Sequence, residues 1–219
     1  MSIAGFFLDL IYPPKCKFCG ASLERESWEP CPKCQKAPFW LEGAQGVFDG
    51  KHFLRCVCAG WYQGALRDQV LAFKFSDHPQ YARAYGPVLA RQVRLFLPGT
   101  YDVITWVPVS RQTLKKRGYD QARLLAEETA RALGREAVPL LEKARATPAQ
   151  SSLESAARRR KNVKGVYAVP RPEQVTGQRV LLIDDILTTG STLEEAARTL
   201  RAAGASQVVA AAFCRTPQD

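Results

Sequence analysis

Two adjacent carboxylates end an apolar run near the carboxyl end of the chain, and small hydroxyl residues follow them. The acids are Asp184 and Asp185, and the residues after them include Thr188, Thr189, Gly190, Ser191 and Thr192. In open parallel sheets, ligands bind beyond the carboxyl ends of the strands, where these acids are expected to lie. A helix that begins near Thr192 presents unpaired N–H groups to the same space, and Gly190 permits close backbone approach. A phosphate fits there.

The hydroxyl residues and the acids suit different groups of one ligand. Hydroxyls can donate hydrogen bonds to a phosphate, whereas Asp184 and Asp185 repel a phosphate and need a donor such as a sugar hydroxyl. A ribose 5-phosphate meets both demands. The stretch is not a Walker A loop, because GxxxxGK[ST] does not occur in it. The alternative interpretation is an ordinary helix cap behind two acids at a strand end.

Four cysteines form two CxxC pairs, Cys16 with Cys19 and Cys31 with Cys34. Two residues between cysteines let both thiolates of a tight turn face one point, and a second pair completes a tetrahedral zinc site. Because four thiolates leave no position for water, the zinc is expected to be structural. Redox-active CxxC pairs are the alternative, but neither pair follows a βαβ pattern. The remaining cysteines are expected to be small core residues, namely Cys56, Cys58 and Cys214.

The elements that must position these groups follow the rhythm of a parallel α/β domain. Alternating residues predict a strand at 52–62, and apolar runs predict strands at 102–109, near 138–141, and at 166–169, 179–185 and 207–213. Apolar residues at helical spacing predict helices at 64–75, 81–97, 121–133 and 192–203. Because the strands are continuous apolar runs, the sheet is expected to be buried on both faces.

Two segments depart from this rhythm. Residues 143–165 are polar, basic and irregular, and a loop of that length in a compact domain is usually functional or disordered. Residues 3–12 predict a short amphipathic helix that packs on the fold, with membrane-surface docking as the alternative. No segment has the roughly 20 apolar residues of a membrane span, and no signal peptide is recognised, so a cytoplasmic protein is expected.

The stretch IDDILTTGST resembles the phosphoribosyl diphosphate (PRPP) signature of type I phosphoribosyltransferases. Over nearly the whole length, the order of motifs is similar to that of the ComF family, whose members include competence proteins needed for DNA uptake. The motifs are CKFCG, CPKC, LAFKF, VPVSRQTLKKRGYDQARLLA, QSSLESAARRRKNVKGVY and the PRPP signature. Asp120 stands in RGYDQ where an asparagine is expected. The resemblance implies a type I phosphoribosyltransferase fold, a mostly parallel sheet flanked by helices, over residues 49–219. It also implies a small zinc-binding module with the N-terminal helix over residues 1–48.

The resemblance also implies roles for individual residues. Asp184 and Asp185 contact the ribose hydroxyls, and residues 188–192 hold the 5-phosphate. The diphosphate, with Mg²⁺, lies on the loop that contains Ser110 and Arg111. Residues 143–165 correspond to a flexible loop that closes over the reacting centre and excludes water. The predicted catalytic residues are Arg111, Arg158 and Arg160, and further candidates for ligand contact are Lys74, Lys115, Arg117, Gln150, Ser151, Arg159 and Asn162. For the arginines of the loop, a solvated basic surface is the alternative.

Two functions remain open at this point. The first is an enzyme that transfers the phosphoribosyl group of PRPP to an unknown acceptor, with no general base assigned because His52 and His78 lie in no motif. The second is a non-catalytic PRPP sensor that binds single-stranded DNA or a DNA-uptake helicase. The excess of 31 basic over 21 acidic residues favours anionic partners. Trp28 and Trp40 could stack on bases, although packing around the zinc site is the favoured interpretation.

Overall fold

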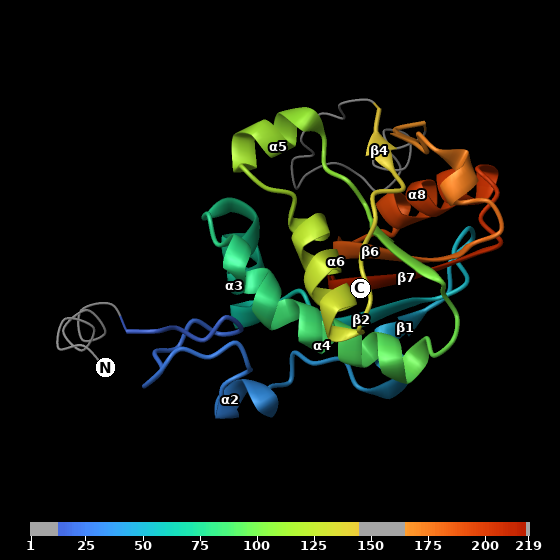
Figure 1. Cartoon of the computed structure of the whole chain (residues 1–219). Coiled ribbons are helices and arrows are strands. Elements are labelled where there is room, and N and C mark those ends of the chain that lie inside the picture. Colours follow the sequence, from blue (N-terminus) through green and yellow to red (C-terminus); the bar gives the residue numbers. More distant parts are fainter. Residues whose placement is uncertain (1–12, 145–164, 218–219) are drawn as a thin grey trace.

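A five-stranded sheet forms the centre of the protein in a computed structural model that describes residues 13–144 and 165–217 (Figure 1). The strand order is β1-β2-β7-β6-β3. The strands β2 (Cys56–Trp61), β7 (Gln207–Arg215), β6 (Arg179–Leu187) and β3 (Val103–Trp106) are parallel. The edge strand β1 (Val47–Phe48) pairs antiparallel with β2. The predicted α/β class with a mostly parallel sheet is confirmed.

Apolar side chains cover both faces of this sheet. Along β6, Leu181 and Ile183 belong to one core cluster, and Val180 and Leu182 belong to another. Helices α4 (Ala82–Phe96) and α6 (Gln121–Ala132) contribute to the first cluster, and α8 (Ser191–Ala202) contributes to the second. Burial on both sides explains why the strands read as continuous apolar runs.

The four predicted helices are confirmed, with every end within one residue of the prediction. Besides α4, α6 and α8, they include α3 (Gly64–Phe75), which matches the predicted range. Helices α4 and α6 approach closely at Gly86, where an added Cβ would lie 2.4 Å from Cβ of Glu128. Shorter helical turns complete the described chain: α2 (Pro32–Gln35), η1 (Gly43–Gly46), η2 (Pro79–Tyr81) and η3 (Pro172–Gln174).

Two predicted strands do not join the central sheet. The segment at 166–169 forms β5 (Tyr167–Ala168), which pairs antiparallel with β4 (Glu142–Lys143) in a separate ribbon. The segment at 138–141 is not a strand; next to it, Ala137 makes a single parallel bridge with Ile104. The prediction was wrong because Leu140 and Leu141 are apolar through burial in the second core cluster, without a ladder of their own.

Helix α5 (Arg111–Arg117) follows β3 in a stretch where the sequence predicts a loop. It contains no buried residue, so it has no apolar stripe by which to recognise it. Its N-terminus is capped by the side chain of Ser110, and it ends at Gly118, which has a φ of 81°.

The cysteine-bearing segment shares the main core. The fully buried ring of Phe18 lies 5.6 Å from the ring of Tyr85 on α4, measured between centroids. The hydroxyl of Tyr85 donates to the carbonyl of Lys17 at 2.8 Å. Strand β1, which falls in the predicted module 1–48, pairs with β2 of the larger domain, and the boundary at residue 48 stays a prediction. The helix predicted at 3–12 lies outside the described residues. Among the described helices, none has the length and apolar character needed to cross a membrane.

Candidate functional site

The acids and the hydroxyl residues lie together at the carboxyl end of β6. This strand continues through both acids to Leu187, and the chain then turns at Gly190, whose φ of 74° is in the left-handed region that favours glycine. Gly190 is the N-cap of α8, and no side chain in the described parts of the chain caps the helix. The hydroxyls of Thr189 and Ser191 lie 2.8 Å apart beside it. The helix N-terminus therefore keeps backbone donors for an anion.

The two carboxylates have different surroundings. Asp185 is 5% exposed, and its Oδ1 lies 3.1 Å from Nζ of Lys74 on α3. Its Oδ2 is buried and has no hydrogen-bond partner among the described residues. Asp184 is half-buried, and its Oδ1 accepts the backbone N–H of Asp185 at 2.8 Å. As a whole residue Asp184 is less buried than Asp185, and Lys74 contacts Asp185 in the protein itself. The ribose contacts of both acids stay a prediction.

Burial dominates the electrostatics at this strand end. Burial raises the pKa of Asp184 to about 8, and the charge of Asp185 adds to the rise, while the charge of Lys74 opposes it. A carboxyl group that resists ionisation until that pH can donate a hydrogen bond as well as accept one near neutrality.

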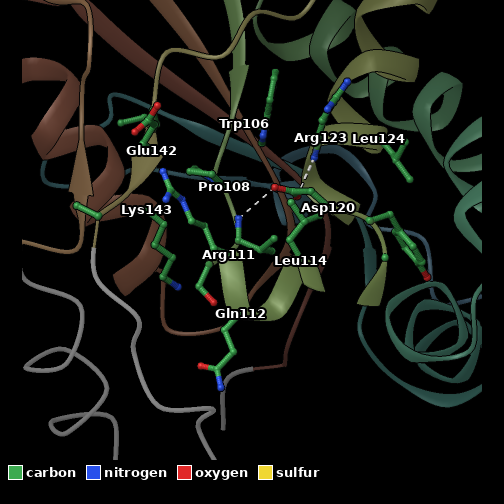
Figure 2. Close-up of a pocket in the computed structure, with 16 residues that line it drawn as sticks. Trp106, Pro108, Arg111, Gln112, Leu114, Asp120, Arg123, Leu124, Glu142 and Lys143 are labelled. Carbon is green, nitrogen blue, oxygen red and sulfur yellow. Dashed lines mark hydrogen bonds between the residues drawn. The ribbon is translucent and has the colours of Figure 1, made fainter. Parts of the chain in front are cut away.

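A cavity of about 1130 Å³ lies beside the carboxyl end of β3, between α5, the start of α6 and β4 (Figure 2). In Figure 2, Glu142 and Lys143 stand across the cavity from Asp120, Arg123 and Leu124. Two residues of the predicted set, Ser110 and Arg111, line this cavity, whereas residues 184–192 do not. The further lining residues are Trp106, Pro108, Val109, Gln112, Leu114, Gly118, Tyr119, Leu141 and Ala144.

The loop that follows β3 is held in place by Asp120, whose role the sequence reasoning missed. One carboxylate oxygen, Oδ1, accepts the backbone N–H groups of Ala122 and Arg123 at 3.1 Å, which caps α6. The other, Oδ2, accepts the N–H of Val109 at 3.1 Å. Burial raises the pKa of Asp120, and these hydrogen bonds oppose the rise. The departure from an expected asparagine in RGYDQ was the signal that could have pointed to it.

The other predicted residues divide into three groups. The hydroxyl of Ser110 is buried and accepts the N–H of Thr113 at 3.1 Å, so it caps α5. Arg117 stacks on the ring of Phe75 at 4.5 Å, and Lys115 is exposed. The residues predicted in the basic loop lie outside the described residues, namely Gln150, Ser151, Arg158, Arg159, Arg160 and Asn162. Their roles stay predictions.

The four cysteines of the two CxxC pairs come together as predicted. Their Sγ atoms all lie within 4.8 Å of one another, and the Cys16–Cys34 and Cys19–Cys31 pairs are each 3.8 Å apart. Four thiolates at about 2.3 Å from a tetrahedral zinc ion would be about 3.8 Å apart, so the cluster has the dimensions of a tetrahedral metal site. The three other cysteines are fully buried in the core, as expected.

Both tryptophans near the cluster pack on the protein. Nε1 of Trp40 donates to the carbonyl of Cys34 at 2.6 Å, and its ring contacts Phe18 edge-on. Trp28 is half-buried, and the cations of Lys17 and Arg83 lie 5.3 Å and 5.7 Å from its ring centroid. These contacts confirm the interpretation of the two residues as packing around the cysteine cluster.

Residues 120–219 match the phosphoribosyl transferase domain family. The DNA utilization protein YhgH of Escherichia coli strain K12 is 32% identical over 213 residues, covering 92% of this chain and 84% of the relative. Competence protein ComFC of Streptococcus pneumoniae strain R6 is 28% identical over 206 residues, covering 88% and 84%. The chain belongs to the ComF family. This membership confirms the resemblance seen in the sequence.

One solved structure is similar to part of this ComF-family chain. The glutamine PRPP amidotransferase of B. subtilis matches 65% of the chain and 30% of its own length, with a TM-score of 0.44 and 22% identity. The phosphoribosyl transferase domain match over residues 120–219 contains Asp120, both strand-end acids and the hydroxyl residues that follow them. Lys74 and the four cysteines precede this match.

Proposed function

We propose that this ComF-family protein binds PRPP with Mg²⁺ at the carboxyl edge of its sheet and transfers the phosphoribosyl group to an acceptor that has yet to be identified. The observation that carries the proposal is the N-terminus of α8, which keeps its backbone donors beside Asp184 and the hydroxyls of Thr189 and Ser191. The phosphoribosyl transferase domain match over 120–219 supports it. The names of the relatives support a role in DNA uptake or DNA utilisation.

In this proposal each part of PRPP has its own set of residues. The 5-phosphate binds the first-turn N–H groups of α8 and the hydroxyls of residues 188–192. The ribose hydroxyls bind Asp184 and Asp185. The diphosphate lies along the loop at Ser110 and Arg111, which Asp120 fixes to α6. Mg²⁺ bound with the diphosphate would neutralise part of its charge, and oxygen atoms of PRPP would supply most of its ligands.

The four cysteines are proposed to hold a structural zinc ion. Their sulfur atoms have the spacing of a tetrahedral thiolate site, and thiolates are ligands that zinc prefers. Because all four ligands come from the protein, the ion has no open position for a substrate. Its role is therefore to fix the segment from Cys16 to Cys34 on the main core.

Calorimetry with PRPP and Mg²⁺ tests the binding site. Ser191→Ala removes a hydroxyl beside the helix N-terminus, and we expect PRPP affinity to fall about tenfold, the effect of one hydrogen bond to a charged group. Thr176→Val removes a hydroxyl near η3, which precedes the amino end of β6, and should leave the affinity unchanged. Equal PRPP affinity in wild type and Ser191→Ala would contradict the phosphate assignment. Release of pyrophosphate with a panel of nucleobases and amines then tests transfer.

A second candidate function is binding of single-stranded DNA by a PRPP-sensing protein. It is favoured by α5, whose sequence RQTLKKR carries Arg111, Lys115, Lys116 and Arg117 with no acidic residue. Next to it, Phe75 is 65% exposed, and an exposed aromatic ring beside cations suits a stacked base. Replacing Lys115 and Lys116 by alanine should weaken binding of a labelled oligonucleotide and reduce its salt dependence. Unchanged affinity and salt slope would count against this candidate.

A further inference from the structure

Lys143 is a partly buried lysine that, unlike the other lysines with buried or partly buried side chains, has no carboxylate partner among the described residues. Residues 13–144 and 165–217 contain three lysines that are not exposed, Lys17, Lys74 and Lys143. Lys17 pairs with Glu26 at 2.7 Å, and Lys74 pairs with Asp185 at 3.1 Å. Within the same residues, Lys143 has no carboxylate within 4 Å of its ammonium group. Because a partly desolvated cation is costly without a counter-charge, Lys143 calls for an anionic ligand.

The surroundings of Lys143 hold its ammonium group at the cavity. Lys143 lies opposite Tyr167 in the ribbon of β4 and β5, and its Nζ is 5.8 Å from the centroid of that buried ring. It lines the cavity together with Ser110 and Arg111. Figure 2 shows Lys143 and Arg111 among the lining residues. Burial lowers the pKa of Lys143, while the more distant charges of Asp184 and Asp120 oppose that change. Lys143 therefore lines the same cavity as the loop after β3, and the charged groups that act on it across the site are acidic.

We propose that Lys143 is a catalytic residue that binds the diphosphate group of PRPP from the side of β4, opposite the loop at Ser110 and Arg111. The proposal rests on the proposed function, because it assigns one group of the same substrate. Four described cations are suggested by the sequence; Lys74, Lys115 and Arg117 do not line the cavity, whereas Arg111 does. Arg111 and Lys143 together provide two positive charges, from two different elements, for one highly charged group.

The charge that develops in the reaction explains why a cation at this position would assist it. When the bond between ribose carbon 1 and the diphosphate oxygen breaks, the electron pair remains on that oxygen. A nitrogen atom of the acceptor forms the new bond to carbon 1 and gives its proton to solvent. The negative charge on the diphosphate therefore grows toward the transition state, and a fixed ammonium group stabilises the transition state more than the bound substrate.

The test compares ligands that contain the diphosphate with one that does not. Calorimetry measures the binding of Mg²⁺-pyrophosphate, Mg²⁺-PRPP and ribose 5-phosphate to wild type, Lys143→Met and Lys143→Arg. We expect Lys143→Met to lose at least tenfold in affinity for pyrophosphate and PRPP, with ribose 5-phosphate within twofold of wild type. Lys143→Arg should recover most of the loss, because it keeps the charge. Lys36→Met, an exposed lysine near the cysteine cluster, is the matched control for net charge.

The outcomes separate this inference from the proposed function. If wild type binds neither PRPP nor ribose 5-phosphate, the proposed function is wrong, and the assignment of Lys143 falls with it. If wild type binds PRPP but Lys143→Met binds pyrophosphate equally well, the PRPP site stands and the role of Lys143 is overturned. Equal losses for pyrophosphate and ribose 5-phosphate in Lys143→Met would also overturn it, because they indicate a structural role.

Discussion

Burial raises the pKa of the Asp184 carboxyl group to about 8, and the charge of Asp185 adds to the rise. The pKa of an aspartate in the unfolded chain is about 3.9. Between these two values the folded protein holds a proton that the unfolded chain releases, so a rise in pH favours unfolding. The slope for one whole proton is about 1.4 kcal/mol per pH unit. Any ligand group that donates hydrogen bonds to Asp184 would offset this cost.

We predict that Asp184→Asn removes this contribution to the pH dependence of stability. The amide keeps an acceptor for the backbone N–H of Asp185 but carries no charge, so the variant should gain stability over wild type as pH rises from 5 to 8. Urea unfolding at several pH values measures the difference. Asp68→Asn, at an exposed aspartate on α3, should follow the wild-type curve. Parallel curves for wild type and Asp184→Asn would refute the burial argument.

Single residues were predictable from the sequence where the chemistry is local. The two CxxC pairs predicted their cluster because each pair fixes its own turn, and the hydroxyl residues follow the acids directly along the chain. The pairing of Lys74 with Asp185 was not predictable, because 111 residues separate the two. The double role of Asp120 was not predicted either, although Asp120 stands where an asparagine is expected. Both of its oxygens accept backbone N–H groups, whereas an asparagine would turn an N–H₂ donor toward one of them.

Among the elements, the contact between α4 and α6 depends on Gly86. Alanine is favoured over glycine in a helix by about 1 kcal/mol, which alone would make Gly86→Ala stabilising. The added Cβ, however, would lie 2.4 Å from Cβ of Glu128 and 2.7 Å from its backbone carbonyl carbon, so the two helices would have to separate. Because backbone gives way less easily than a flexible side chain, we expect a net loss of about 1–3 kcal/mol.

Urea unfolding of Gly86→Ala measures this loss. Arg91→Ala is a suitable control, since Arg91 is an exposed residue of the same helix and its replacement should change stability by less than about 0.5 kcal/mol. A Gly86→Ala variant more stable than wild type would show that α4 and α6 can separate at little cost. The higher helix propensity of alanine would then determine the change in the free energy of unfolding.

Elements with an apolar face were predictable, and elements without one were not. The ends of α3, α4, α6 and α8 followed from apolar periodicity and agree within one residue. Helix α5 buries no side chain and is defined by its caps, Ser110 and Gly118, so periodicity gave no signal for it. The reverse error occurred at 138–141, where apolar residues fill the core beneath irregular backbone. Both errors lie beside the cavity, and the walls of the candidate site were therefore the least predictable part of the fold.

At the scale of the whole molecule, the cysteine cluster and the sheet are joined through a row of aromatic rings. Phe18, between the cysteines of the first pair, contacts Tyr85 of α4, and Tyr85 stacks on Phe213 of β7 with centroids 4.2 Å apart. The order of motifs along the chain predicted both parts of the fold. It could not predict that they share one core, because the contacts of Tyr85 join segments far apart in the sequence.

This shared core predicts that the proposed zinc ion stabilises the entire protein. Removing the metal frees the segment that carries Phe18, and the core then loses a buried aromatic side chain, a change that costs about 3–5 kcal/mol when the ring is truncated. A zinc chelator should therefore lower the single melting temperature measured by calorimetry, together with the metal content measured by mass spectrometry. Cys16→Ser should melt at the lower temperature without chelator, whereas Cys56→Ala, in the core away from the cluster, should keep its metal. Two separate transitions, with the sheet domain melting at an unchanged temperature after metal loss, would show that the cysteine module folds independently and that the aromatic row transmits little stability.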